Sequence, residues 1–137
     1  MAIIDLVDVY KMIWSNMSQL SCPIFDYVPY GSDNYPYAYI GGLYTREDNT
    51  KNTDGISCEL YINVYSAYKG RKEILELMNE IDGLMSKDMS DDEYTVFVHR
   101  GRHTVMQKQE QLGMGVTDNN IFYHAVLIYD IDVKKKY

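Results

Sequence analysis

The segment from Ser57 to Tyr65 alternates strictly between two kinds of residue, and this alternation constrains the fold more than any other feature of the sequence. The apolar set is Cys58, Leu60, Ile62 and Val64, and the polar or aromatic set is Ser57, Glu59, Tyr61, Asn63 and Tyr65. Successive side chains of a strand point to opposite faces of a sheet. The pattern therefore predicts a half-buried strand whose outer face carries two tyrosine rings.

Two further segments have the 3.6-residue period of an amphipathic helix. One runs from about Ile3 to Met17 and the other from about Gly70 to Met85, each with an apolar face and a polar face. A helix of this kind buries its apolar face against a neighbouring layer. We expect a shared core that contains Ile13, Trp14, Ile62, Val64, Ile74 and Ile81.

Four more segments have the character of strands, namely Ile24–Val28, Tyr37–Tyr44, Tyr94–Arg100 and Ile121–Val133. The paired glycines Gly41 and Gly42 indicate a bulge, a bend or a close backbone approach within a strand. The connections are polar and comprise Pro29–Asn34, Arg46–Gly55, Lys87–Glu93 and a long excursion over Gly101–Asn120. A loop as long as this excursion is usually functional or flexible in a compact domain.

This order of elements predicts one α+β domain over residues 1–137. We expect a mostly antiparallel sheet of about 4–5 strands, with the two amphipathic helices packed on one of its faces.

The composition excludes several classes of protein. A formal charge of −7 weighs against sequence-independent binding to nucleic acid, where basic residues must neutralise phosphates. No apolar run approaches the length of a membrane span, and the N-terminus lacks the basic region of a secretory signal. Cys22 and Cys58 do not form a disulfide framework. We therefore expect a soluble intracellular protein with no membrane partner.

The residues that usually carry chemistry do not form a recognisable constellation. His99 and His103 would share one face of a strand but stand roughly 13 Å apart, which is too far for one metal ion. The acidic run Asp91–Glu93 lacks the spacing of a calcium loop, and no nucleophile elbow, P-loop or dinucleotide fingerprint is present. We expect no catalytic residue, no metal, no cofactor and no enzyme activity.

Tyrosine is unusually frequent, with fourteen residues against three phenylalanines. Its ring supplies apolar contact area and its hydroxyl tolerates water, so it is enriched at contacts between proteins. The tyrosine and asparagine face of Ser57–Tyr65 is the best binding candidate. An equally simple interpretation is that another element of the same domain covers this face.

The segment from Pro36 to Met85 resembles the tail-terminator (tail-completion, head–tail joining) proteins of long-tailed bacteriophages. The shared pattern is Pro36-Tyr37-Ala38-Tyr39-Ile40-Gly41, a polar loop, a strand ending in Val64-Tyr65-Ser66, then Gly70 and a long helix. The N-terminal helix and the C-terminal strand extend the resemblance in order over the chain.

The resemblance implies a hexameric ring on the finished tail tube, which stops tube polymerisation and gives the filled capsid a docking surface. Its partners would be other copies of the chain, the tail-tube protein and a head or neck connector, with DNA only passing through. The protein would be found in the virion tail or neck, and in the host cytoplasm during assembly. The candidate oligomer interface is Tyr37, Tyr39, Tyr61, Asn63 and Tyr65. The segment Gly101–Asn120 would face the tube or its lumen.

Two alternatives remain open on the sequence. A head-completion or neck protein of the same virion machinery has a similar size and also works as a ring. A small dimeric ligand-binding or metabolic domain belongs to a different class, and a large apolar pocket ringed by convergent polar groups would favour it.

Overall fold

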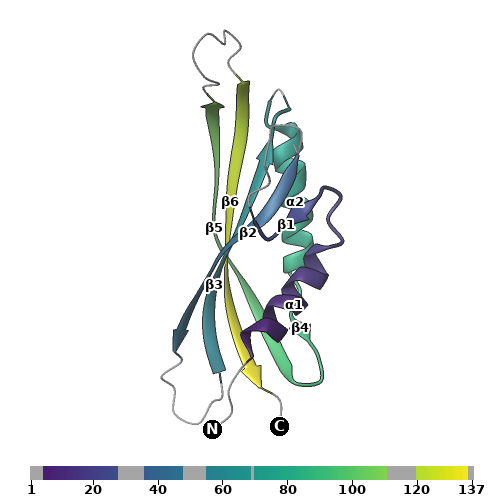
Figure 1. Cartoon of the computed structure of the whole chain (residues 1–137), viewed down its shortest axis with the longest axis vertical. Helices are drawn as coiled ribbons and strands as arrows, with labels where there is room; N and C mark the ends of the chain where they lie inside the picture. Colours follow the sequence, from purple (N-terminus) through teal and green to yellow (C-terminus); the bar gives the residue numbers. More distant parts are fainter. Residues whose placement is uncertain (1–4, 28–35, 48–54, 69, 111–119, 136–137) are drawn as a thin grey trace.

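The computed structural model of the chain describes residues 5–27, 36–47, 55–68, 70–110 and 120–135. Its elements are α1 (Leu6–Met17), β1 (Ile24–Phe25), β2 (Tyr37–Glu47), β3 (Gly55–Ser66), α2 (Lys72–Met85), β4 (Met89–Ser90), β5 (Tyr94–Glu110) and β6 (Asn120–Lys135). The six strands form one sheet in the order β1-β2-β3-β6-β5-β4, and only the pair β1–β2 is parallel. Both helices lie on one face of this strongly twisted sheet (Figure 1).

The predicted α+β class, the mostly antiparallel sheet and the helices on one face are confirmed. The sheet has six strands, however, so the expectation of 4–5 was too low. The additional strand is β4, which has two residues and lies inside the segment 87–93 that was predicted as a loop. So short a strand leaves no repeating pattern in the sequence, because its pairing with β5 alone defines it.

The strand β5 continues to Glu110, well beyond its predicted end at Arg100. It pairs with β6 from Tyr94 opposite Lys135 to Glu110 opposite Asn120. The predicted excursion over Gly101–Asn120 is therefore wrong for residues 101–110, and residues 111–119 lie outside the described residues. The backbone ladder with β6 supports the strand here, so the polar sequence gave no sign of it.

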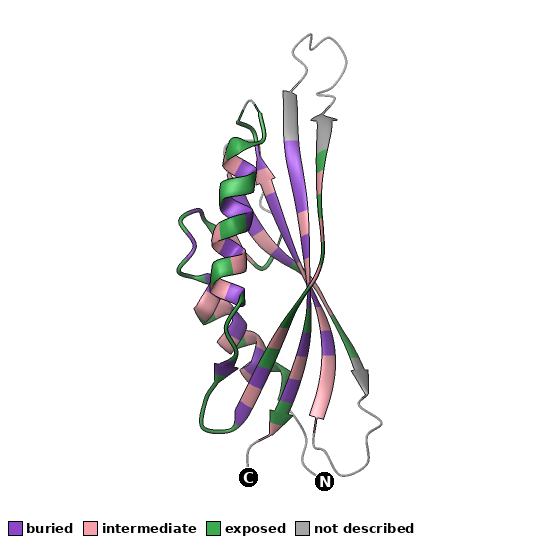
Figure 2. Ribbon diagram, turned by 180° about the vertical axis from the view of Figure 1, so that it is seen from behind, coloured by how far each residue is buried: buried purple, intermediate pink, exposed green. Residues whose placement is uncertain are grey.

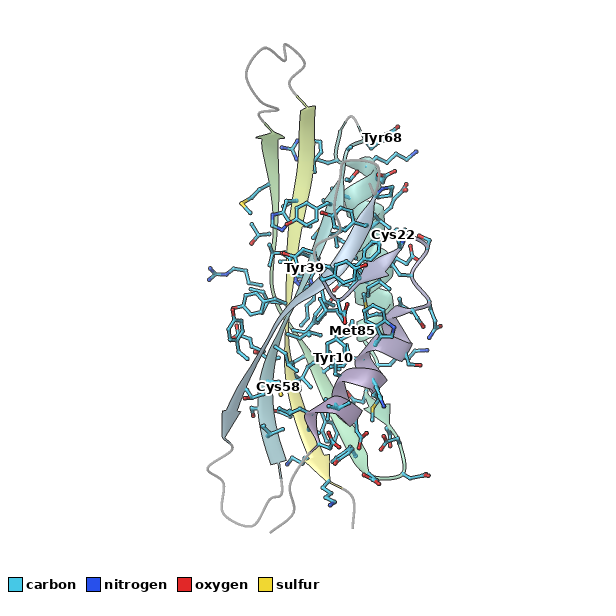
Figure 3. All side chains as sticks on the ribbon, in the orientation of Figure 1. Tyr10, Cys22, Tyr39, Cys58, Tyr68 and Met85 are labelled. Carbon is cyan, nitrogen blue, oxygen red and sulfur yellow. The ribbon has the colours of Figure 1, made fainter. Side chains whose placement is uncertain are left out.

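The core fills the space between the helices and the inner face of the sheet, which is the face that Cys58, Leu60, Ile62 and Val64 share. Figure 2 shows buried residues on the helices and strands where these layers meet, and Figure 3 shows side chains around Met85 filling the space between them. The residues Ile13, Ile62, Val64, Ile74 and Ile81 are all fully buried, as predicted. Trp14 is only half-buried and stacks against Tyr10, with ring centroids 6.3 Å apart.

The ends of α1 follow ordinary capping chemistry. The Asp5 carboxylate accepts a hydrogen bond of 2.9 Å from the Val7 N–H and so caps the first turn. The helix ends at Met17, as predicted, whereas the predicted start at Ile3 lies outside the described residues. Neither helix of the described chain has the length and apolar character needed to cross a membrane.

Two bulges lie at the same level of the sheet. One interrupts β2 between Ile40 and Gly42, and the other interrupts β5 between Arg100 and His103. Ile40 and His103 are connected by one row of paired residues, because Ile40 lies opposite Ile62, Ile62 opposite Leu127, and Leu127 opposite His103. Bulges increase local twist, so two at one level help explain the strong twist of the sheet in Figure 1. Of the three alternatives that Gly41 and Gly42 indicated, the structure shows the bulge.

The bulge in β5 also separates the two histidines that were expected to share a face. His103 bonds to Asp82 of α2 on the helix side, whereas His99 lies near Asp132 on the opposite side. The expectation of a shared face was wrong because the extra residue of the bulge reverses the alternation between them.

Candidate interaction surface

The face of β2, β3, β6 and β5 opposite the helices is called the open face below, because no helix of the described chain covers it (Figure 1). Its side chains form rows that run from β2 to β5. Three of these rows are Tyr37–Tyr65–His124–Met106, Tyr39–Asn63–Val126–Thr104 and Tyr44–Glu59–Asp130–His99. All five residues of the predicted interface lie on this face.

An aromatic cluster occupies the first two rows, with Tyr65 at its centre. The Tyr65 ring stacks on Tyr37 at 5.0 Å, on Tyr39 at 5.9 Å and on His124 at 4.3 Å between centroids. Stacked cross-strand pairs of this kind stabilise a sheet beyond the area that they bury. The cluster is thus part of the subunit's own packing as well as part of its surface.

The exposure of the cluster divides the predicted interface into two groups. Tyr37 and Asn63 are only 5% and 9% exposed, whereas Tyr39 and Tyr65 are half-buried. The Asn63 Oδ1 lies 2.8 Å from the His124 Nε2. Because an amide oxygen can only accept, this ring nitrogen is protonated and donates a hydrogen bond to it. Tyr37 and Asn63 therefore hold the cluster in place, whereas the rings of Tyr39 and Tyr65 remain partly exposed.

Gly41 is required by this arrangement. A Cβ atom at Gly41 would lie 2.3 Å from the Asn63 Nδ2 and 3.0 Å from the Tyr39 ring. The bulge and the missing side chain together let the Asn63 amide lie close over the β2 backbone.

Tyr61, the fifth predicted residue, lies on the other side of the bulge from the cluster. Its hydroxyl donates a hydrogen bond of 3.1 Å to Glu59, and its ring meets Tyr44 edge-on at 5.2 Å. The hydrogen bond to Glu59 is the main reason that the pKa of Tyr61 is raised. Tyr44, with 61% of its surface exposed, was not predicted for this face, because the bulge shifts the alternation of β2.

The open face is acidic beyond Tyr61, toward the N-terminal end of β3. Glu59 and Asp130 lie directly opposite each other on β3 and β6, and Asp132 follows two residues further along. The Ser57 hydroxyl donates to Asp132 at 2.8 Å, and His99 lies 3.5 Å from the same carboxylate. Directly opposed like charges destabilise a sheet, so the Glu59–Asp130 pair is unfavourable in the isolated subunit.

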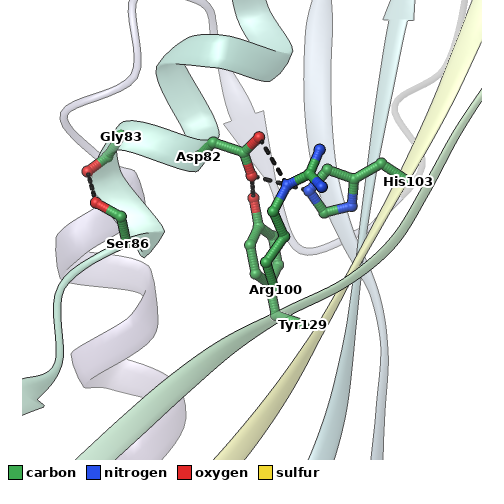
Figure 4. A network of polar contacts seen from close by, with 6 residues as sticks. All are labelled: Asp82, Gly83, Ser86, Arg100, His103 and Tyr129. Carbon is green, nitrogen blue, oxygen red and sulfur yellow. Dashed lines mark hydrogen bonds and ion pairs between the residues drawn. The ribbon is translucent and has the colours of Figure 1, made fainter.

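A polar network on the helix side joins α2 to the sheet (Figure 4). Asp82 accepts hydrogen bonds from the Tyr129 hydroxyl, from His103 Nε2 at 2.8 Å and from Arg100 Nε at 3.3 Å. Burial alone would raise the pKa of Asp82, but the bonds from Tyr129 and His103 outweigh it and lower that pKa. Burial and the bond to Asp82 raise the pKa of Tyr129.

This network fits a structural role better than a catalytic one. At neutral pH the shifts keep Asp82 ionised and Tyr129 protonated, which fixes the donor and the acceptor of their bond. The two cysteines are buried elsewhere, Cys58 on β3 and Cys22 before β1. Among the described residues, no group of histidine, cysteine or acidic side chains could hold a metal ion.

Two pockets in the described part have volumes of about 330 and 260 Å³. The larger lies beside α2 and is lined in part by Glu73, Glu76 and Glu80. Ser66 and Ser21 already donate hydrogen bonds to Glu73 and Glu80. The smaller lies next to the Asp82 network.

Comparison with known proteins identifies the family of the chain. The sequence profile described as "Tail completion protein gp17" matches residues 17–118, which is well over half of the chain. The chain belongs to this family. The resemblance predicted from Pro36–Gly41 and from the strand and helix that follow is therefore confirmed. This tail completion protein is thus a structural protein of the phage virion, with a role in the tail or neck.

A solved structure supports the fold of the tail completion protein. One chain of a structure titled "Virion of native gene transfer agent (GTA) particle" aligns with a TM-score of 0.66 and 14% sequence identity. The alignment covers 92% of this chain and 91% of that chain. At this identity the likeness shows a shared fold and nothing finer. No curated protein matches the sequence.

Proposed function

We propose that this tail completion protein forms a closed ring, of six copies as in the terminators that it resembles, on the end of the finished tail tube. The ring ends tube polymerisation and offers the filled head a joining surface. The observation that carries the proposal is the open face on a chain of this family. It is a sheet surface that no helix of the described residues covers, and it carries half-buried tyrosines.

The chemistry of the open face suits assembly from free subunits. Tyr39, Tyr61 and Tyr65 are half-buried and Tyr44 is exposed, so ring area remains for a partner. A subunit that waits in solution needs a contact surface less apolar than a core, and the tyrosine hydroxyl meets that need. Tyr37 and Asn63 support these contact residues from within the subunit.

The edges of the sheet favour a head-to-tail contact between identical subunits. β1 pairs with only two residues of β2, and β4 with only two residues of β5. Within the described residues, the rest of each edge has a pairing partner on one side only. β2 and β5 run in opposite directions. If β5 of one subunit lies beside β2 of the next, the two strands are therefore antiparallel when both subunits have the same orientation. A head-to-tail contact forms a ring when the rotation between successive copies closes, which is what the proposal requires here.

The charge distribution suits a structure that DNA crosses without binding. The chain carries a formal charge of −7, and Glu59, Asp130 and Asp132 add an acidic region to the open face. Sequence-independent binding to DNA would require neutralisation of phosphates by basic residues. The proposed partners are therefore the tail-tube protein and a head or neck connector, and the role is structural and not enzymatic.

The direct test is native mass spectrometry of the full chain, alone and with tail-tube protein, together with deletion of the gene in its phage. We expect a hexamer, and infected cells that make overlong or headless tails beside DNA-filled heads. A chain that stays monomeric with tube protein present would overturn the ring. Deletion that leaves tails of normal length but heads unjoined would instead identify a head-completion or neck protein.

A further inference from the structure

The two outer columns of the open face have complementary chemistry. The β2 column contains Tyr37, Tyr39 and the exposed Tyr44, so it is aromatic. The β5 column includes Arg102, which the bulge places with Gly101 opposite Ile128. Ile128 lies on the open face, and a Cβ atom at Gly101 would lie 3.5 Å from its side chain, so Gly101 belongs to that face. Arg100 and His103 on either side of the bulge both face the helix side, so we infer that Arg102 shares the open face with Gly101.

The short strands β1 and β4 limit which residues of the β2 and β5 edges can pair with a second copy of the chain. β1 covers the β2 edge at Ala38 and Tyr39, and β4 covers the β5 edge at Thr95 and Val96. Between these levels the edge is open on both sides within the described chain. The open stretch contains Gly42 to Tyr44 on β2 and His99 to Arg102 on β5.

The charges at this level are unbalanced within one subunit. Arg102 is exposed and makes no ion pair with any described residue. Glu59 lies beside Tyr44 in the same row and faces the carboxylate of Asp130. Among the side chains that the structure describes, which do not include that of Arg46, no cation lies within ion-pair distance of Glu59. One subunit therefore presents the Arg102 guanidinium at its β5 edge. It presents the Glu59 carboxylate, which accepts a hydrogen bond from Tyr61, on β3 next to the exposed Tyr44 ring of the β2 edge.

We propose that the occupant of this edge is a second copy of the chain, with Arg102 of one subunit over the Tyr44 ring and paired with Glu59 of the next. A guanidinium stacks on an aromatic face and binds a carboxylate at the same time, which a lysine does less well. Arg102 would also relieve the repulsion between Glu59 and Asp130. Arg100, three residues before His103, is already held by Asp82 on the helix side and takes no part.

This inference rests on the proposed ring and is tested by charge exchange in the full-length protein. The variants are Arg102→Glu, Glu59→Arg and the two combined, and the measurement is the ring population in native mass spectrometry over a range of concentrations. We expect each single reversal to raise the concentration needed for half-assembly by about tenfold or more. The combined variant restores assembly at least in part, because the pair is re-formed with its signs exchanged. Tyr44→Phe should assemble like the native chain, and Tyr44→Leu should not.

Two controls separate this inference from the proposed ring. Lys87→Glu reverses an exposed cation before β4 and should leave assembly unchanged. Thermal unfolding checks that every variant is folded, and Arg102→Gln provides a neutral second substitution.

The outcomes distinguish this contact from the proposed ring. If the native chain forms rings and the folded Arg102→Glu and Glu59→Arg variants form them equally well, the proposed contact is wrong but the proposed ring is not. A combined variant that assembles no better than the single variants would also show that the proposed contact is wrong. If the native chain forms no ring with tube protein present, the proposed function fails, and this contact fails with it.

Discussion

The rings of Tyr65 and His124 stack across β3 and β6, with centroids 4.3 Å apart and planes that differ by 7°. Tyr37 and Tyr39 stack on the same tyrosine from β2. Tyr65 thus stabilises the subunit through its packing, and under the proposed function its half-buried ring would also contact a partner. Tyr61 lies outside this stack, and its ring meets Tyr44 edge-on while its hydroxyl bonds to Glu59. The two tyrosines should therefore respond differently to truncation.

We expect Tyr65→Ala to lower the free energy of unfolding by about 2 kcal/mol, since it removes three stacked contacts. Tyr61→Ala should change this free energy by less than about 1 kcal/mol and should still weaken the ring. The double variant should be a folded monomer that cannot cap tail tubes. Urea unfolding and tail-length measurement by electron microscopy test both parts, and tubes capped at normal length by the double variant would remove Tyr61 and Tyr65 from the interface.

A comparison of Gly41→Ala with Gly83→Ala tests the close approach of Asn63 to β2. The new Cβ at position 41 would lie 2.3 Å from Asn63 Nδ2, so the bond from His124 to Asn63 must be distorted. We expect a loss of about 1–2 kcal/mol in the free energy of unfolding. At Gly83, within α2, a Cβ meets nothing within 4 Å, so alanine should stabilise the helix by about 0.5–1 kcal/mol. Equal effects at both positions would show that Gly41 has no special role.

The Asp82 network predicts a pH dependence of stability. Its bonds lower the pKa of Asp82 in the folded protein below the ordinary value of 3.8. A carboxyl group of this kind contributes stability above its unfolded pKa and loses that contribution as the pH falls through its folded pKa. We therefore expect Asp82→Asn to be clearly less stable than the native chain at pH 7, and this difference to shrink at and below about pH 3.8. Urea unfolding between pH 7 and pH 3 measures it.

The control for this experiment is Asp92→Asn, which replaces an exposed carboxyl group in the loop before β5. This variant should unfold like the native chain throughout the range. A difference between the native chain and Asp82→Asn that stays constant with pH would mean that the lost bonds are not linked to ionisation.

Replacing His99, His103 and His124 by glutamine should leave assembly intact, because no metal or catalytic role is expected for them. Stability losses should be unequal. His103 and His124 bond to Asp82 and Asn63 and are almost completely buried, so each replacement should lower the free energy of unfolding by about 1–2 kcal/mol. His99 is exposed, and its replacement should have almost no effect. Stoichiometric zinc in the purified protein, measured by elemental analysis, would contradict this expectation.

Local periodicity by itself determined much of this protein. The alternation of Ser57–Tyr65 predicted both β3 and the face that carries Tyr61, Asn63 and Tyr65, because side chains on a strand alternate whatever lies beside it. The helical period predicted α1 and α2 with their buried faces. The pattern from Pro36 to Met85 also indicated the family, since these elements follow one another along the chain.

Only the tertiary structure decided what depends on pairing between distant segments. The bulge between Arg100 and His103 is defined against Leu127 and Tyr129 of β6, so no local pattern reveals that His99 and His103 face opposite ways. The bulge at Gly41 likewise brings Tyr44 onto the open face. The burial of Tyr37 and Asn63 depends on stacking and hydrogen bonds across strands. The periodicity of a sequence predicts which residues share a face of one helix or strand. The pairing register of the strands and the burial of each side chain depend on contacts between elements that are distant in the sequence.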